Sequence, residues 1–161
     1  MNIAIPEAYP PMRAALPFDS VSFGYTTIHL HPFSALGEAQ EGYGVVPEGD
    51  ETDWEPSWVV IGYEDNTGDP IFIDTEDNDL PVYTAAHGMG EWTPRLIAFS
   101  FRHFVNILEQ VRGVARGRET PIALERNPLS DIERDEALSF IRRNNPDVDM
   151  TFWEVLLRPP E

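Results

Sequence analysis

The chain has 161 residues, of which 42% are hydrophobic and 24% charged, and its formal net charge is −17. This length suits one well-buried core, and fifteen prolines with eleven glycines indicate many turns rather than a long helical bundle. The lack of cysteine excludes disulfides, thiolate metal sites and cysteine catalysis. No run of roughly 20 apolar residues predicts a membrane helix, and the N-terminus does not resemble a signal peptide. We therefore expect a cytoplasmic protein that does not act in a membrane.

The negative charge is concentrated in one part of the chain. Between Arg13 and Arg95 there are sixteen acidic residues and no basic one. Such a surface repels the phosphates of nucleic acids, so we expect no direct binding of DNA or RNA. It attracts a basic protein and accelerates the association. The alternative interpretation is that the acidity only keeps the protein soluble.

The first third of the chain predicts short elements. Residues 1–20 are rich in proline and predict an extended arm on the surface. Residues 21–31 predict a strand or a broken pair of strands, with a bend near Thr26. Residues 32–40 allow one helical turn, and residues 45–56 predict an exposed acidic loop.

The segment from Trp58 to Tyr83 predicts a β-meander. Three apolar, partly β-branched runs alternate there with two acidic turns, 64–69 and 75–79. A glycine-containing loop over residues 85–93 follows, and then a short apolar run begins at Leu96. This pattern predicts a compact sheet that presents carboxylates at the tips of its loops.

The last third predicts helices. Ser100 is a candidate N-cap for an amphipathic helix that ends near Gly117. Residues 118–128 resemble a linker or an edge element, and Ser130 with Glu133 predicts a capping box for a helix to about residue 143. Asp147 or Asp149 caps a final short helix over residues 152–156 in this interpretation.

Few residue patterns indicate catalysis or metal binding. His29 and His31 lie two apart and face the same side of an undistorted strand, but no third metal ligand is apparent near them. The acidic turns lack the spacing of a calcium loop, although an irregular cation site is not excluded by the residue types. The sequence contains no G-x-S-x-G elbow, Walker A loop, H-E-x-x-H motif or Rossmann fingerprint, and Gly88 and Gly90 alone do not indicate phosphate binding. We therefore expect that the protein is not an enzyme and binds no cofactor.

The order of several short motifs resembles the SUKH superfamily. They are the tryptophan-led strand from Trp58, the segment Gly68-Asp69-Pro70-Ile71-Phe72-Ile73-Asp74, the Pro81-Val82-Tyr83 strand, and Ala98-Phe99-Ser100-Phe101 at the start of a helix. The resemblance implies an α+β fold with a mostly antiparallel, twisted sheet and packed helices. The match covers roughly residues 21–112. We therefore expect a proline-rich arm of residues 1–20, a core of residues 21–117 that resembles this superfamily, and a helical C-terminal extension of residues 118–161 packed on the core.

The resemblance also implies a role in protein binding. Many bacterial members of that superfamily are similar to immunity proteins that neutralise a toxin domain, often a nuclease, and a fungal relative regulates cell-wall synthesis. Members usually begin with a helix that follows an L-P-x-x-[YF] segment. Here the corresponding residues 16–19 lead almost directly into the first strand, so we expect the N-terminal helical part to be shortened and a groove between it and the sheet to be altered.

The combined expectation is an immunity protein whose acidic loops cover a cognate toxin or another basic protein. The candidate partner-binding residues are Trp54, Asp65, Asp69, Glu76, Asp77 and Asp79. Trp54 is included because acidic neighbours suggest that it is exposed, whereas Gly68 and Asp69 have an equally good interpretation as structural hairpin residues. The alternatives are a regulatory or scaffold protein without a toxin, and a small enzyme that uses carboxylates or a metal.

Overall fold

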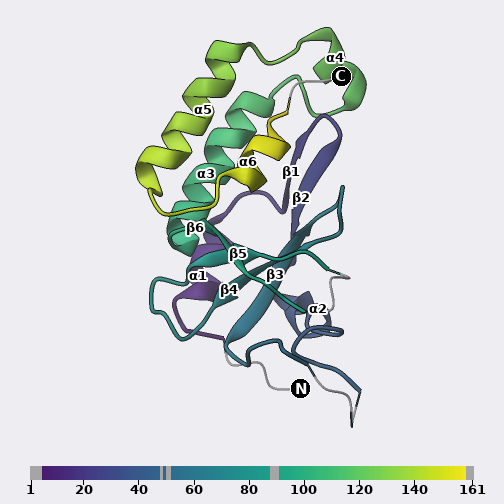
Figure 1. Cartoon of the computed structure of the whole chain (residues 1–161), viewed down its shortest axis with the longest axis vertical. Coiled ribbons are helices and arrows are strands. Elements are labelled where there is room, and N and C mark those ends of the chain that lie inside the picture. Colours follow the sequence, from purple (N-terminus) through teal and green to yellow (C-terminus); the bar gives the residue numbers. More distant parts are fainter. Residues whose placement is uncertain (1–4, 48, 50–51, 88–90, 159–161) are drawn as a thin grey trace.

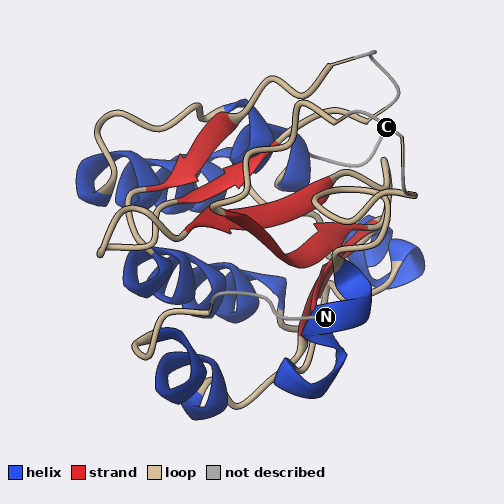
Figure 2. Ribbon diagram, turned by 90° about the horizontal axis from the view of Figure 1, so that it is seen from below, coloured by secondary structure: helices blue, strands red, loops and turns tan. Residues whose placement is uncertain are grey.

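Six strands form a single antiparallel sheet in which each strand pairs with the next one along the chain (Figure 1). The computed structural model describes residues 5–47, 49, 52–87 and 91–158. The strands are β1 (Ser20–Phe23), β2 (Thr26–Leu30), β3 (Trp58–Glu64), β4 (Pro70–Asp74), β5 (Val82–Thr84) and β6 (Arg95–Ala98). Figure 2 shows them as one curled sheet with helices packed around it. The predicted α+β fold with a twisted antiparallel sheet is confirmed.

The first two strands form a hairpin, which confirms the predicted broken pair. The turn lies at Gly24 and Tyr25, just before the predicted bend at Thr26. Gly24 has a φ of 56°, and a Cβ there would lie 2.3 Å from Cδ2 of Leu124. Glycine is therefore favoured both by the backbone conformation and by the Leu124 side chain that packs against this turn.

The predicted meander corresponds to β3, β4 and β5. A bulge interrupts the pairing of β3 with β4 between Val60 and Gly62. A Cβ at Gly62 would lie 2.2 Å from the carbonyl oxygen of His29, so the bulge depends on a residue without a side chain. Gly68 has a φ of 80° in the turn that follows β3. Of the two predicted loops around the meander, residues 48, 50–51 and 88–90 lie outside the described residues.

The N-terminal arm is partly helical, so the expectation of an extended arm is wrong for residues 9–15. Helix α1 spans Tyr9–Ala15, with prolines in its first turn. Proline is tolerated there because the first backbone N–H groups of a helix have no partner within the helix. The Tyr9 ring is fully buried and packs edge-on against Phe101 at 4.9 Å between centroids.

The predicted helix caps at Ser100 and Ser130 are present. Ser100 Oγ accepts a hydrogen bond from the His103 N–H at 3.0 Å and begins α3 (Phe101–Ala115). Ser130 and Glu133 form the capping box of α5 (Asp131–Asn144). Helix α6 (Thr151–Leu156) has Met150 at its N-cap without a side-chain capping bond, so the predicted cap at Asp147 or Asp149 is wrong. Asp149 Oδ1 does accept a hydrogen bond from the Thr151 N–H at 2.9 Å. A short 3₁₀ turn, η1 (Phe33–Ala35), and α2 (Leu36–Ala39) fill the predicted helical turn before the acidic loop.

Residues 121–126 form a helix that the sequence analysis interpreted as a linker or edge element. Helix α4 (Pro121–Arg126) begins with the Thr120 side chain accepting from the Ala123 N–H at 3.1 Å. A threonine followed by proline at the first helical position is a recognised signal for the start of a helix, so this helix could have been predicted from the sequence.

The C-terminal segment covers the β6 edge of the sheet. The Asp149 N–H donates to the Leu96 carbonyl oxygen at 2.8 Å, and the Trp153 indole N–H donates to the Ile97 carbonyl oxygen at 2.8 Å. These bonds satisfy backbone groups that an edge strand otherwise exposes. Trp153 and Leu156 belong to the main core, so the extension is packed into the domain.

The two faces of the sheet carry cores of different size. On one face, the apolar side chains of the strands pack against α1, α3, α5 and α6 in a large main core. On the other face, Trp54, Val60, Phe72 and Ala85 form a small aromatic cluster with partly buried neighbours that include Tyr43, Trp58, Tyr83 and Trp92.

Candidate acidic protein-binding surface

The acidic residues singled out in the sequence lie on two turns at opposite ends of β4. Asp65 and Asp69 belong to the turn between β3 and β4, and the remaining three acids belong to the turn between β4 and β5. Because β4 has five residues and a strand rises by about 3.4 Å per residue, the turns are roughly 17 Å apart. The predicted residues therefore form two separate groups rather than one site.

In the first acidic turn, Glu64 to Asp69, the carboxylates accept hydrogen bonds from within the protein. Glu64 is 8% exposed, and its carboxylate accepts from the Asn66 N–H at 2.5 Å, the Thr67 N–H at 3.1 Å and the Thr67 hydroxyl at 2.6 Å. Asp65 accepts from the Thr27 N–H at 2.8 Å and lies 3.1 Å from Nε2 of His29. These contacts hold the turn against β2.

Asp69 connects the first acidic turn to a segment that is distant in sequence. Its side chain is 14% exposed, and Oδ1 accepts from the His87 N–H at 3.1 Å and lies 2.8 Å from Nδ1 of the same residue. These contacts support the structural interpretation of Asp69, in which its side chain stabilises the turn. The partnership with His87 was missed because no pattern in the sequence relates positions 18 residues apart.

In the second acidic turn, Thr75 to Asp79, the carboxylates face solvent. Glu76, Asp77 and Asp79 are exposed. Asp77 Oδ1 accepts only the local Asp79 N–H at 2.9 Å, and the carboxylates of Glu76 and Asp79 accept no hydrogen bond from any described residue. This turn carries charge that is free to act on a partner.

Trp54 is buried, so the expectation that its side chain is exposed is wrong. It is 3% exposed, its indole N–H donates to the Trp58 carbonyl oxygen at 2.9 Å, and its ring lies 4.6 Å from that of Phe72. The loop folds back over the second face of the sheet and places this apolar ring inside, while Asp53 and Glu55 on either side stay exposed. Trp54 supports the surface from beneath and offers no side-chain surface to a partner.

Two partly exposed aromatic residues lie next to the second acidic turn instead. Trp58 is directly opposite Asp74 in the pairing of β3 with β4, and Tyr83 is opposite Phe72 in the pairing of β4 with β5. Burial raises the pKa of the Tyr83 phenol above its ordinary value, and the carboxylates of Asp74 and Asp77 raise it further. We call this surface the acidic aromatic edge; it consists of Trp58, Asp74, Glu76, Asp77 and Tyr83.

Trp58 and Asp74 were not selected as binding residues in the sequence analysis. Trp58 and Asp74 are paired across β3 and β4 and therefore lie on one face of the sheet. Phe72 lies on the same face, because it is two residues from Asp74 and side chains alternate along a strand. That signal was available once the register of the meander was known. The register itself depends on the bulge between Val60 and Gly62, which the apolar pattern does not show.

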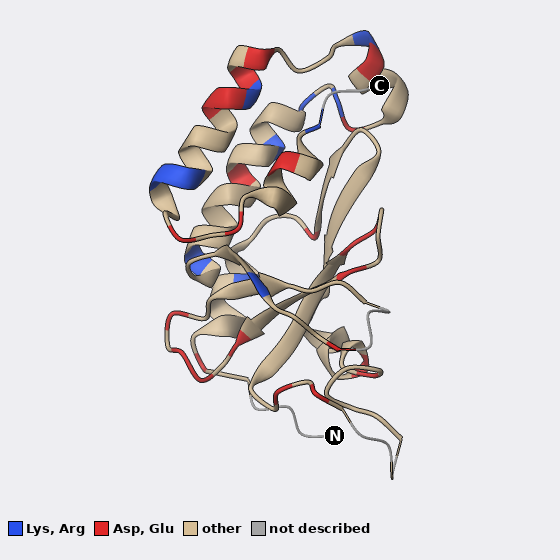
Figure 3. Ribbon diagram, in the orientation of Figure 1, with Lys and Arg blue, Asp and Glu red and all other residues tan. Residues whose placement is uncertain are grey.

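The basic residues do not offset this charge. Arg13, the one base before Arg95, is 6% exposed; its guanidinium pairs with Asp19 and donates to the His31 carbonyl oxygen. Figure 3 shows acidic segments on the turns and loops around the sheet, while most basic segments lie in the helical half. The uneven distribution along the chain is therefore also an uneven distribution in space.

The two histidines considered as metal ligands face the same side, as the spacing predicts, but they pack on a tyrosine. The His29 ring stacks on Tyr63 at 4.7 Å between centroids, and the His31 ring lies 5.6 Å from it. Burial lowers the pKa of His31, with further lowering from the charges of His29 and Arg13. In the described part of the chain, no group of three or more His, Cys, Asp or Glu side chains is placed to hold a metal ion.

No helix of the described residues is both long enough and apolar enough to cross a membrane. The chain was also compared with known proteins. It matches no protein-family model, no curated protein and no solved structure.

Proposed function

We propose that this protein is a cytoplasmic, non-enzymatic binding module that neutralises a cognate toxin by covering a basic surface of the toxin domain. The observation that carries the proposal is the acidic aromatic edge, where solvated carboxylates surround two partly exposed aromatic rings. The resemblance of the meander and of the Ser100 helix start to the SUKH superfamily supports the immunity class. A nuclease domain is a suitable partner, because a surface that binds nucleic acid is basic.

The two kinds of side chain have different roles in this proposal. Carboxylates on the second acidic turn attract a basic partner over a distance and raise the association rate, an effect that salt screens beyond about 8 Å. Trp58 and Tyr83 supply apolar contact area once the partner has docked. Affinity then depends on the aromatic pair, and the rate of association on Glu76 and Asp77.

The proposal is tested by co-expression with the C-terminal domain of a toxin encoded beside this gene. Rescue of growth supports immunity. Failure to rescue, together with stable binding to a non-toxic partner, favours the regulatory or scaffold alternative, which uses the same surface.

Charge reversal then tests the surface. We expect the double variant Glu76→Lys, Asp77→Lys to slow association with the toxin domain by about tenfold or more at low salt, as measured by stopped flow. The matched control is Asp135→Lys, Glu136→Lys, which reverses two adjacent exposed acids on α5 and changes the net charge equally. Equal slowing in both variants contradicts a role for this particular surface, and no slowing contradicts the electrostatic part altogether.

A further inference from the structure

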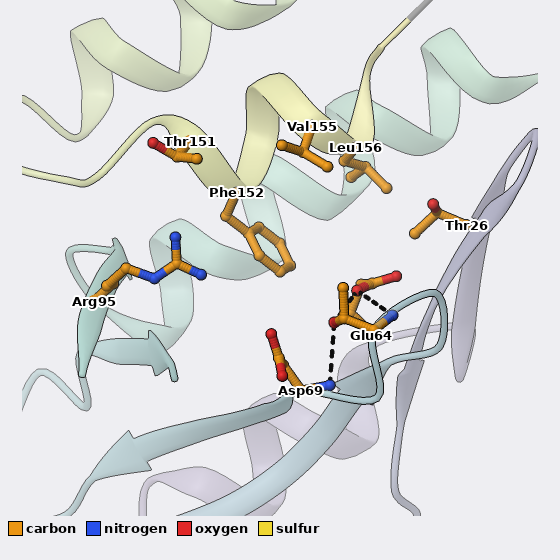
Figure 4. A pocket seen from close by; sticks show the side chains of 9 residues that line it. Thr26, Glu64, Asp69, Arg95, Thr151, Phe152, Val155 and Leu156 are labelled. Carbon is orange, nitrogen blue, oxygen red and sulfur yellow. Dashed lines mark hydrogen bonds between the residues drawn. The ribbon is translucent and has the colours of Figure 1, made fainter. Parts of the chain in front are cut away.

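A cavity of ≈ 140 Å³ lies between the first acidic turn and helix α6 (Figure 4). It is separate from the acidic aromatic edge, which lies at the other end of β4. Nine residues line it: Thr26, Glu64, Thr67, Asp69, Arg95, Thr151, Phe152, Val155 and Leu156. The apolar part of the wall comes from α6, and the charged part comes from the sheet.

Two opposite charges on the wall of this cavity do not pair with each other. Figure 4 shows the Arg95 guanidinium and the Asp69 carboxylate both directed into the space, with Phe152 beside them. No ion pair joins them among the described residues, and the Arg95 guanidinium donates no hydrogen bond to any of those residues. Arg95 is partly exposed, so its guanidinium keeps unused donors that water or an anionic ligand can reach.

Two of the other polar residues that line the cavity are already engaged. Glu64 and Thr67 bond to each other and to backbone N–H groups of the turn. Asp149 does not line the cavity. Its pKa is lowered mainly by the hydrogen bond from the Thr151 N–H and in smaller part by the positive charge of Arg95. Asp69 uses Oδ1 for His87 and keeps Oδ2 without a hydrogen bond from any described residue. The Oδ2 atom of Asp69 and the Arg95 guanidinium are thus the charged groups that remain to bind a ligand.

We propose that this cavity binds a small aliphatic α-amino acid as its zwitterion. The ligand's ammonium group binds Asp69, its carboxylate binds Arg95, and its side chain lies against Phe152, Val155 and Leu156. A singly charged ligand satisfies only one of the two side chains, whereas a zwitterion satisfies both.

The size of the cavity limits the ligand. A cavity of about 150 Å³ in another protein holds benzene, so this space accommodates roughly six to eight non-hydrogen atoms. Amino acids from alanine to valine have that size. Aromatic and long basic amino acids exceed it.

The first test is a titration of the ¹⁵N-labelled protein with valine, followed by NMR. We expect saturable shifts of the amides of Asp69, His87 and Arg95, with a Kd in the millimolar range or tighter. Two half-ligands serve as controls: isobutylamine lacks the carboxylate, and 3-methylbutanoate lacks the ammonium group. Each should bind at least about tenfold more weakly than valine if both charges are read.

Variants locate the binding groups. Asp69→Asn and Arg95→Gln should each weaken valine binding by about tenfold or more, while Asp65→Asn in the same turn and Arg102→Gln on α3 leave it unchanged. A dispersed NMR spectrum shows that each variant is folded, and the half-ligand comparison stands even if one variant is not. Absence of saturable shifts, equal affinity for a half-ligand, or full affinity in both cavity variants overturns the proposal and leaves a cavity filled by water only.

Discussion

The two acidic turns of the meander have similar composition and opposite roles. In the first, Glu64, Asp65 and Asp69 accept hydrogen bonds from the turn itself, from β2 and from His87. In the second, Glu76 and Asp79 accept none from the described residues. The difference shows that a run of carboxylates in a turn is structural where neighbouring segments present donors, and is free to act on a partner where they do not.

The surroundings of each turn explain the difference. The first turn is flanked by the start of β2 on one side and by His87 on the other, so backbone and histidine donors surround it. The second turn projects from the opposite end of β4. Its contacts use the Thr75 N–H and hydroxyl, which both donate to the Ser57 carbonyl oxygen at 2.8 Å, and the Asp79 carbonyl oxygen, which accepts from the Phe101 N–H at 3.2 Å. These contacts leave the carboxylates in solvent.

The largest expected effect is the loss of the Glu64 carboxylate. Glu64→Ala leaves the Asn66 and Thr67 donors without their acceptor in a partly buried turn, so we expect a decrease of about 2–3 kcal/mol in the free energy of unfolding. Urea denaturation measures it. The matched change Glu76→Ala in the second turn should alter stability by no more than about 0.5 kcal/mol. Equal effects at the two positions would contradict the distinction between the turns.

A smaller effect is expected at Asp69. Asp69→Ala removes two contacts to His87 and should lower the free energy of unfolding by about 1–2 kcal/mol. Asp79→Ala is the control in the second turn, where the carboxylate has no bond from a described residue. Amide hydrogen exchange adds a local reading: protection of the His87 N–H should fall in Asp69→Ala alone.

The histidines beside the first turn predict a pH effect. Burial lowers the pKa of His31 below its unfolded value of 6.5, so the unfolded chain binds this proton more readily than the folded one. This part of the stability is complete above pH 6.5 and is lost as the pH falls below that value. The urea midpoint of the wild type should therefore fall more steeply from pH 7 to pH 5 than that of His31→Gln. Parallel slopes would show that the His31 proton is not involved.

The smallest effect tests the field of the second turn. The carboxylates of Asp74 and Asp77 contribute to the raised pKa of Tyr83. Asp77→Asn should move that pKa back toward its ordinary value, because one negative charge no longer opposes the phenolate. NMR of ¹³C-labelled tyrosine follows the titration, and Asp65→Asn, in the first turn, provides the comparison. An unchanged pKa in Asp77→Asn would place this carboxylate too far from Tyr83 to be part of one surface.

Elements that depend on neighbouring residues were predicted well. The caps at Ser100 and Ser130 and the strands of the meander are present, because a cap or a turn is a contact between residues a few positions apart. The helices at Tyr9–Ala15 and Pro121–Arg126 were missed because their prolines were interpreted as breakers. Proline in the first turn of a helix costs little, and the burial of Tyr9 and Leu124 in the main core stabilises both segments.

The sequence predicted that the candidate surface is acidic, but it did not predict where its aromatic side chains lie. The concentration of acids between Arg13 and Arg95 is visible in the sequence, and so is the exposure of Glu76 and Asp77 in a polar turn. The burial of Trp54 was not visible in the sequence, because its acidic neighbours favour an exposed loop. The rings against which it packs belong to Trp58, four positions later, and to Phe72, 18 positions later. Tertiary contact decided the place of each aromatic ring.

The sequence by itself determined the class of the fold, the order of the strands along the meander, the starts of α3 and α5, and the sign of the charge. These properties depend on composition, on periodicity and on contacts within a few residues. Only the tertiary structure decided which carboxylates are bound and which are free, that Trp54 is buried, and that Asp69 and Arg95 face one cavity. Those outcomes depend on which distant segments come to lie beside a residue, since a donor or an apolar ring within contact distance changes what the same side chain does.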